Sequence, residues 1–359
     1  MTESQLVADV IASPDDDAPR LVYADWLQER GDPRGELIAL QCELARADAA
    51  DERPGRTRPL RARVAELIAA HHAVWLDPLF EICAGYYELR RGFVEHLAIM
   101  QHEIDAAKLH AAAPLLREVA IPHEYVAELP ALASAIAITH LTIDGTARYA
   151  LHPEKLSILR RLDLARCGEA MIPGSFELLP ELEHLGLHVA PEAPLDRVGE
   201  LLMRVRVGSR VRSFAFGPFT KLRPQELFRF EQLRKLVLTG PVRELQALAI
   251  AQPHLTSLGL VDCGFPLKMA ELVGRLPELR HLRIVGSFVT DAAAEAIAHA
   301  APQLARLDLS HNKLTVAGAH RLIELLPGLV ELRLRDNAFA PDELAGVRSE
   351  RGEVLELVL

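Results

Sequence analysis

The sequence predicts an α/β solenoid, a curved parallel sheet of about twelve short strands with a helical domain at its N-terminal end. Two observations predict it. A short leucine motif recurs twelve times between residues 94 and 359, and the first 93 residues contain helix signals but no copy of that motif. We therefore expect two domains, a helical cap over 1–93 and a solenoid over 94–359.

The recurring motif fits the leucine-rich-repeat pattern LxxLxLxx(N/C)xL. Clear copies are LRRLDLARC, from Leu159, and LARLDLSHNKL, from Leu304. One copy cannot bury its own leucines, whereas stacked copies bury a continuous ladder, each adding one parallel strand. Successive copies start 21 to 29 residues apart, at positions 94, 116, 138, 159, 182, 211, 233, 255, 279, 304, 329 and 354.

The segments between the last copies predict helices. TDAAAEAIAHAAPQ, from Thr290, and TVAGAHRLIELLPG, from Thr315, each begin with a threonine that suits a helix cap. Loops are expected for VAPEAPLD, from Val189, and for DERPGRTRP, from Asp51.

At the ninth position of a copy, Asn or Cys bonds neighbouring backbone. That position is filled as expected by Cys167, Cys263, Asn312 and Asn337, and not by Ala190, Phe219 or Pro241. We therefore expect a less regular middle of the solenoid, and cysteines that are buried and protonated rather than nucleophilic.

The N-terminal region predicts three amphipathic helices, over residues 3–11, 18–30 and 34–47. Its string PDDDAPRLVYADWLQERGDPRGELIALQ resembles the repeat-companion domain, a bacterial module at the N-terminus of repeat proteins. WLDPL, from Trp75, and RRGFVEHLAI, from Arg90, resemble the usual continuation into the repeats. The resemblance implies a leucine-rich-repeat protein, and it brings no activity or catalytic residues with it.

The same string gathers carboxylates that a catalytic or metal site would also use. Asp25 and Glu29 are four residues apart on one predicted helix face, with Asp32 close behind. Three interpretations are open: an Arg–carboxylate lattice that joins the helices, a metal or partner site, or a catalytic carboxylate pair. The lattice is the interpretation that we favour, because the string supplies its own cations: Arg20, Arg30 and Arg34.

Composition and motifs narrow the function classes. The net charge of −10 argues against nucleic acid as a partner. No stretch is long and apolar enough for a membrane span, the first residues lack the pattern of a signal peptide, and the four cysteines form no CxxC pair. We therefore expect a reduced, cytoplasmic protein. Without a phosphate loop, a GxSxG or an HExxH motif, we expect no catalytic residue, no cofactor and no metal.

The x side chains of each LxxLxL strand share one face of the sheet, called here the x face, which we expect to be concave and to bind a protein partner. From Gly186 to Gly259 the central x position is small or apolar, leaving room for a peptide or helix; towards the C-terminus arginines gather. Self-association through the last strand, within residues 354–359, is a further hypothesis. The predicted partner-binding residues are His184, Gly186, His188, Lys235, Val237, Gly259, His281, Arg283, Arg306, Asp308, Glu331, Arg333 and Arg335.

Overall fold

The computed structural model of the protein divides into two compact units, Met1–Ile143 and Asp144–Leu359. The N-terminal unit therefore includes the helices and the first strands of the sheet, while the C-terminal unit contains the remaining repeats. The boundary expected at residue 93 stays a prediction. The structure describes residues 2–50, 54–101, 103–145, 151, 155–167, 176, 178–189, 210–218, 227–228, 230–241, 246–264, 266–344 and 356–358.

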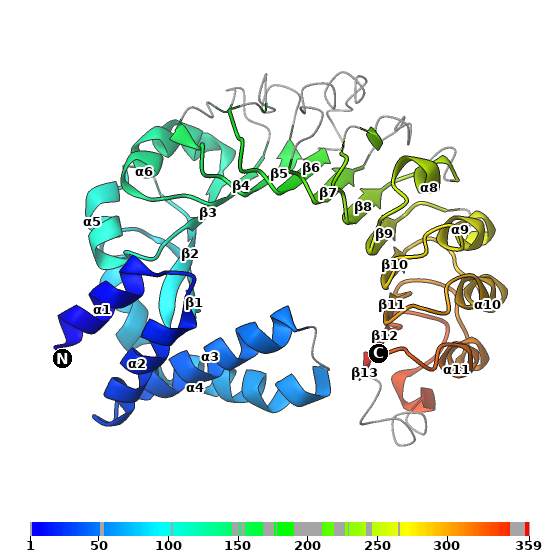
Figure 1. Ribbon diagram of the computed structural model, residues 1–359, viewed down its shortest axis with the longest axis horizontal. Coiled ribbons are helices and arrows are strands. Elements are labelled where there is room, and N and C mark those ends of the chain that lie inside the picture. The colour runs from blue at the N-terminus through cyan, green and yellow to red at the C-terminus, as the bar shows by residue number, and fades with distance from the viewer. Residues whose placement is uncertain are drawn as a thin grey trace. The chain divides into compact units, whose positions relative to one another are not determined.

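Four helices open the N-terminal unit (Figure 1): α1 Glu3–Ala12, α2 Asp17–Gln28, α3 Pro33–Ala49 and α4 Pro54–Phe80. The first three match the predicted helices to within two residues at each end. The loop expected from Asp51 is wrong from Pro54 onwards, because α4 begins at that proline. Proline suits the first position of a helix, where its missing N–H would have no partner. Residues 51–53 lie outside the described part of the chain.

The acidic residues of the opening string start the helices. The Asp16 carboxylate accepts a hydrogen bond from the Ala18 backbone N–H, and the Asp32 carboxylate accepts one from the Arg34 N–H, at 2.9 and 2.8 Å. Each thus satisfies one of the donors that a helix leaves unpaired at its start. Gly35 then allows α3 to approach α2 closely, since a Cβ atom there would lie 2.5 Å from the Ala24 carbonyl oxygen.

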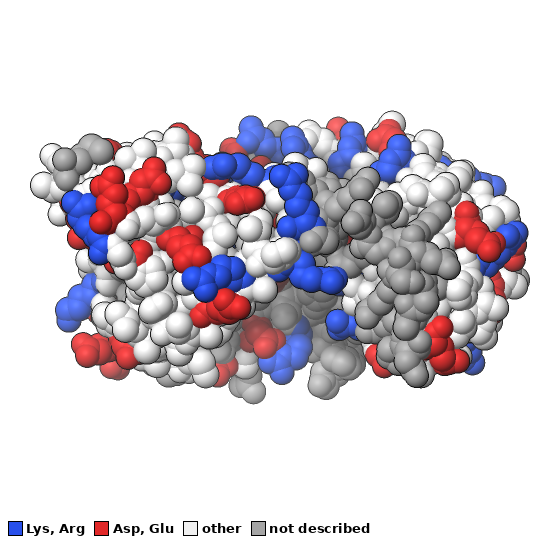
Figure 2. All heavy atoms as spheres, turned by 90° about the horizontal axis from the view of Figure 1, so that it is seen from below, with Lys and Arg blue, Asp and Glu red and all other residues white. Residues whose placement is uncertain are grey.

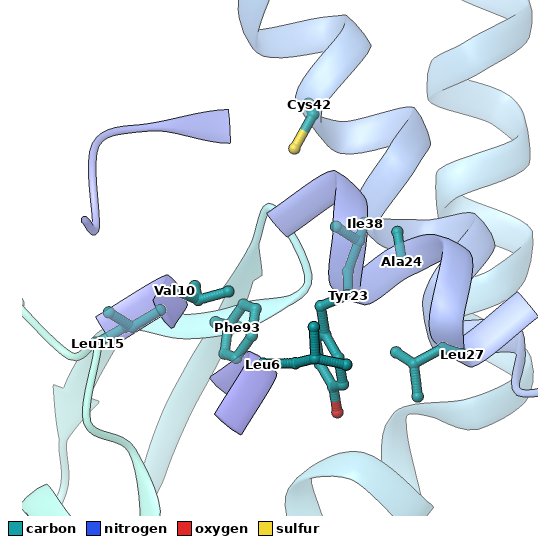
Figure 3. Packing of buried hydrophobic residues seen from close by; sticks show 9 residues of the cluster. All are labelled: Leu6, Val10, Tyr23, Ala24, Leu27, Ile38, Cys42, Phe93 and Leu115. Atoms are coloured by element: carbon teal, nitrogen blue, oxygen red, sulfur yellow. The ribbon is translucent and has the colours of Figure 1, made fainter. Parts of the chain in front are cut away.

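An apolar core joins these helices to the first strands of the same unit. Tyr23 of α2 lies with its ring centroid 6.0 Å from that of Phe93, and Leu6 and Val10 of α1 pack against the same cluster (Figure 3). Burial raises the pKa of the Tyr23 hydroxyl to about 12, assisted by its hydrogen bond to Glu3. The aromatic residues of the string are therefore core residues.

The strands follow one another in chain order in one sheet of 13, and β1 pairs antiparallel with β2. The pairs from β5 to β13 are all parallel. Every predicted copy of the leucine motif gives one strand, whereas β1 was not predicted. The strands are β1 Gly85–Arg90, β2 Phe93–Ile99, β3 Glu118–Pro122, β4 His140–Asp144, β5 Arg161–Cys167, β6 His184–Val189, β7 Ser213–Gly217, β8 Lys235–Thr239, β9 Ser257–Val261, β10 His281–Val285, β11 Arg306–Asp308, β12 Glu331–Arg333 and β13 Glu356–Val358.

A second ladder, of polar side chains, ties the last repeats together. The buried Asn312 amide donates to the Ile284, Leu309 and Ser310 carbonyl oxygens, and its oxygen accepts two backbone N–H groups. Asn337 and Cys263 take equivalent positions, as predicted. The Cys263 thiol is buried, and burial raises its pKa to about 12, so it stays protonated.

Sequence reasoning missed one member of this ladder. Ser287 occupies the ninth position of its repeat, where the pattern asks for Asn or Cys, and its hydroxyl accepts the Cys263 N–H while donating to the Val285 carbonyl oxygen. The side chain of Cys167 and residues 190 and 219 lie outside the described part of the chain, as does nearly all of the loop expected from Val189.

Helices α9 to α11 line one side of the strands β9 to β12 in the C-terminal unit (Figure 1). The two helices predicted at Thr290 and Thr315 are confirmed, but neither threonine side chain makes a cap bond. The Thr315 hydroxyl instead donates to the Asp291 carboxylate at 2.6 Å, joining neighbouring arms. The arm helices are α5 Ala106–Ala112, α6 Leu129–Ala135, α8 Ala247–Ala251, α9 Pro266–Val273, α10 Asp291–Ala300 and α11 Val316–Leu325, with 3-10 turns η1 His123–Glu128 and η5 Pro341–Leu344.

Candidate functional site

The register of the C-terminal unit aligns the predicted x-face residues in two rows. Lys235, Ser257, His281, Arg306 and Glu331 are successive partners in one row, and Val237, Gly259, Arg283, Asp308 and Arg333 in the next. Because equivalent residues recur on every strand, their side chains lie about 4.8 Å apart across the sheet. Strand pairing thus brings together residues that are up to 98 positions apart in the sequence.

Nine of the thirteen predicted residues line one cleft of about 420 Å³ on this face. We call it the C-terminal cleft. The nine are Lys235, Val237, Gly259, His281, Arg283, Arg306, Asp308, Glu331 and Arg333, and the other lining residues are Ser257, Leu258, Leu282 and Leu307. Its volume lies within the range of protein sites that hold small ligands or the side chains of a partner.

The charges in the C-terminal cleft are ordered by depth. The Glu331 side chain is 8% exposed and the Asp308 side chain 19%, whereas the Arg283 and Arg333 side chains are 55% and 53% exposed. The Arg283 Nε lies 3.4 Å from an Asp308 oxygen, and Glu331 pairs with both Arg306 and Arg333. The carboxylates therefore lie deeper in the cleft than the guanidinium groups that they pair with, and the Arg283 and Arg333 side chains face solvent.

The predicted residues on β6 are placed differently. His184 lies between two neighbouring strands: its Nε2 is 3.0 Å from the Asp163 carboxylate and its Nδ1 is 2.7 Å from the Ser213 hydroxyl. Nε2 donates to the carboxylate, and the second ring nitrogen, Nδ1, shares a hydrogen bond with the serine hydroxyl. Burial by itself raises the pKa of Asp163, but the hydrogen bonds and charges of His184 and Arg161 together outweigh it and hold that pKa below its usual range.

The room expected over Gly186 is taken by this same pair. A Cβ atom at Gly186 would lie 2.1 Å from the Asp163 carboxylate, so glycine is required for the carboxylate to reach His184. At Gly259 the nearest neighbours of a Cβ atom would be the Val237 methyl groups, at 3.1 and 3.2 Å, so the floor there is low and apolar. Gly259, unlike Gly186, lines the C-terminal cleft, with the Val237 methyl groups close beside it.

Aspartate, histidine and serine in this order are the residue types of nucleophilic catalysis. Such a site also needs donors that stabilise an oxyanion. Ser213 lies on β7, which pairs in parallel with β6 on one side and β8 on the other, so the backbone N–H groups of the strand are used by the sheet. The bonds from Asp163 through His184 to Ser213 act as a tie across three strands.

Like His184 and Gly186, two more predicted residues lie outside the C-terminal cleft. His188 is half-buried on β6 next to Gly217 of β7, and Arg335 is exposed just beyond the end of β12. Neither is brought to the residues that line the C-terminal cleft.

The opening string forms an arginine cluster in the N-terminal unit. The fully buried Arg20 donates to the Glu95 carboxylate at 2.7 Å, to the Pro14 carbonyl oxygen at 2.9 Å and to the Arg91 carbonyl oxygen at 3.1 Å. Arg91 and Arg117 also pair with Glu95, whose side chain is 3% exposed. Burial lowers the pKa of the Arg20 guanidinium, and the charge of Glu95 opposes that shift.

The carboxylates of the metal or catalytic interpretation are not gathered into a site. Asp25 and Glu29 are exposed, Glu29 pairs with Arg30 at 3.8 Å, and Asp32 caps α3. Among the residues that the structure describes, no three His, Cys, Asp or Glu side chains are placed to share a metal ion. Figure 2 shows acidic and basic side chains side by side over the N-terminal helices, consistent with pairs such as Arg63–Glu36 and Arg61–Asp48.

A second cleft, of about 570 Å³, lies within the N-terminal unit. Leu44, Val64 and Ile68, from α3 and α4, form an apolar wall, while Arg90 and Glu118, on β1 and β3, lie among the charged lining residues. Arg90 pairs with both Glu88 and Glu118, so one cation is shared by two carboxylates. Asp25, Glu29 and Asp32 do not line this cleft.

The twelve leucine motifs, their strands and the shared ladder of Cys263, Ser287, Asn312 and Asn337 decide the architecture. The chain folds as a leucine-rich-repeat solenoid. No family model and no curated protein matches the sequence. The resemblance of the N-terminal residues to the repeat-companion domain stays a prediction.

Two solved structures are similar to the chain. One is an internalin of Listeria monocytogenes, 14% identical, with 80% of this chain and 94% of that chain covered at a TM-score of 0.39. The other is a protein of Bacteroides fragilis, 15% identical, covering 79% and 85% at a TM-score of 0.43. A separate property concerns membranes: no helix in the described residues has both the length and the apolar character to span one.

Proposed function

We propose that this protein is a non-enzymatic scaffold that binds a protein partner on the x face of its repeats. The observation that carries the proposal is the C-terminal cleft, because it gathers nine charged, polar or small side chains from β8 to β12 on a face that the arm helices leave open. A repeat sheet presents such side chains at a regular spacing, which suits recognition of an extended surface.

The rigid parts of the repeats support this role. Hydrogen bonds of ladder residues such as Asn312 hold neighbouring repeats together, and ion pairs with Asp308 and Glu331 hold the Arg283 and Arg333 side chains in place. A surface that is already ordered before binding loses less conformational entropy when a partner arrives. The absence of nucleic-acid and membrane partners, and a cytoplasmic location, stay predictions.

A site-specific crosslink tests the proposal. A photo-reactive amino acid is placed at Ser257, in the C-terminal cleft, and in a matched variant at Glu324, on the exposed side of α11. We expect a defined crosslinked protein from an extract of the source organism at Ser257 and not at Glu324. Equal crosslinking at both positions, or crosslinking at Glu324 alone, would contradict binding on the x face.

The two alternative functions have separate tests. Metal-dependent or catalytic activity in the N-terminal unit predicts that Asp25→Ala leaves the melting temperature unchanged while metal binding or activity is lost. Self-association through residues 354–359 predicts that their deletion changes the assembly state, which analytical ultracentrifugation measures. β13, at the end of the strand order, is the strand that this deletion removes.

A further inference from the structure

The charges of the C-terminal cleft do not balance. Arg283, Arg306 and Arg333 line the cleft together with the carboxylates of Asp308 and Glu331, so its lining has one more guanidinium than carboxylates. Lys235 raises the excess to two, since four cations face two carboxylates. This local charge has the opposite sign to the net charge of the chain, −10. A positive cleft on an acidic protein is selective for negative charge.

The depth of the charges strengthens this selectivity. The Asp308 oxygen that does not face Arg283 accepts the Ser310 N–H at 3.0 Å, and the Glu331 carboxylate is almost fully buried under Arg306 and Arg333. A ligand on the surface therefore meets guanidinium and ammonium groups before it meets a carboxylate. Guanidinium groups suit carboxylates particularly well, because they donate two parallel hydrogen bonds.

The dimensions of the C-terminal cleft favour an extended ligand. From Lys235 on β8 to Arg333 on β12 there are four strand intervals, or about 19 Å. An extended peptide of about six residues covers that length at about 3.3 Å per residue. The low floor of Ser257 and Gly259 lies between the cations, so the peptide backbone can approach the sheet there.

The spacing of the cations is of the same order as the spacing of acidic side chains in such a peptide. Arg283 and Arg333 lie in the same row two strands apart, which is about 10 Å at the backbone. Acidic side chains at alternate positions of an extended peptide are about 7 Å apart and point to the same side. Flexible arginine side chains can close the remaining difference.

We propose that the C-terminal cleft recognises an extended segment of about six residues that is rich in Asp or Glu. The segment lies across β8 to β12, with its carboxylates paired to Lys235, Arg283 and Arg333. This inference rests on the proposed function and adds the chemistry of the partner to it.

Binding of fluorescein-labelled hexaglutamate, measured by fluorescence anisotropy, tests the inference, with hexaglutamine as the neutral comparison. We expect the full chain to bind hexaglutamate at least about tenfold more tightly than hexaglutamine, and the double variant Arg283→Glu/Arg333→Glu to lose at least about tenfold in affinity. Binding should weaken as NaCl rises from about 50 to about 300 mM, because the contacts are partly exposed.

Arg321→Glu is the matched control. Arg321 is 48% exposed on α11 and pairs with carboxylates, as the cleft arginines do, but it lies outside the C-terminal cleft. Its replacement should change the affinity by less than about threefold. Equal loss in Arg321→Glu, or equal affinity for the two peptides, would overturn the inference. Arg283→Gln/Arg333→Gln, which removes charge without adding acids, guards against misfolding and should also weaken binding.

The two experiments separate the two proposals. A crosslink at Ser257 together with no preference for hexaglutamate would keep the x face as the binding surface and reject an acidic partner. A preference for hexaglutamate that does not depend on Arg283 and Arg333 would reject the C-terminal cleft as its site.

Discussion

Arg20→Met is the perturbation that most directly tests whether the opening string is structural. The substitution removes three hydrogen bonds from a cationic donor, to Glu95, Pro14 and Arg91, while keeping an apolar side chain of similar length. Two partly buried carbonyl oxygens lose this donor, and that of Pro14 keeps a hydrogen bond from Arg91. Glu95 keeps Arg91 and Arg117, so its charge stays compensated and the loss is smaller than for an isolated ion pair. From these terms we expect the free energy of unfolding to fall by about 3–5 kcal/mol.

The chain offers a selective probe for this measurement. Its two tryptophans, Trp26 and Trp75, both lie in the N-terminal unit, so the tryptophan fluorescence during urea unfolding reports that unit alone. With a slope of about 2 kcal/mol per molar urea, Arg20→Met should lower the midpoint by roughly 2 M. Arg30→Met is the matched control, because Arg30 is half-exposed and stacks on the Trp26 ring at 3.7 Å.

We expect the control to change stability by less than about 1 kcal/mol. If Arg20→Met shifted the midpoint no further than Arg30→Met, the lattice interpretation would be wrong, and a buried arginine without a structural role would point to a binding site in the N-terminal unit.

Three further predictions concern the repeats. Asn312→Ala should lower the free energy of unfolding by about 3 kcal/mol, because it leaves buried backbone groups unpaired. Asn337→Ala should cost less, because the Asn337 side chain is half-exposed. Thermal melts that rank the two variants equally would contradict the role of the polar ladder. Asp163 has a folded-state pKa below its ordinary 3.8, so its contribution to stability is present above pH 3.8 and is lost as the pH falls through the folded pKa. The difference in unfolding free energy between wild type and Asp163→Asn should therefore shrink in acid. A difference that stays constant would count against the pairing of Asp163 with His184. Gly186→Ala should lower the free energy of unfolding by about 1–3 kcal/mol, because the new Cβ atom would lie 2.1 Å from the Asp163 carboxylate. Gly259→Ala should cost less, because its Cβ atom would lie 3.1 Å from a methyl group of Val237. Equal costs in urea titrations would contradict the placement of the Asp163 carboxylate above Gly186.

The candidate site was predictable in part. The motif places each x residue on a strand face, and constant register then aligns Lys235 with His281 and Arg283 with Arg333. The hydrogen bonds of His184 were not predictable, because its partners, Asp163 and Ser213, lie 21 and 29 residues away in the sequence, on other strands. The signal was present in the row assignment, which puts Asp163 and Ser213 on neighbouring strands, but only side-chain direction shows that they bond.

By itself the sequence determined the solenoid, its twelve strands and the three short N-terminal helices, because leucine spacing and cap residues are local signals that recur in register. The tertiary structure decided which charges are available. It buried Arg20 against Glu95, put Asp163 over Gly186, and left Arg283 and Arg333 facing solvent above their carboxylates. The physical reason is that the cost or gain of a charge depends on burial and on partners distant in the chain, and neither is written in local spacing.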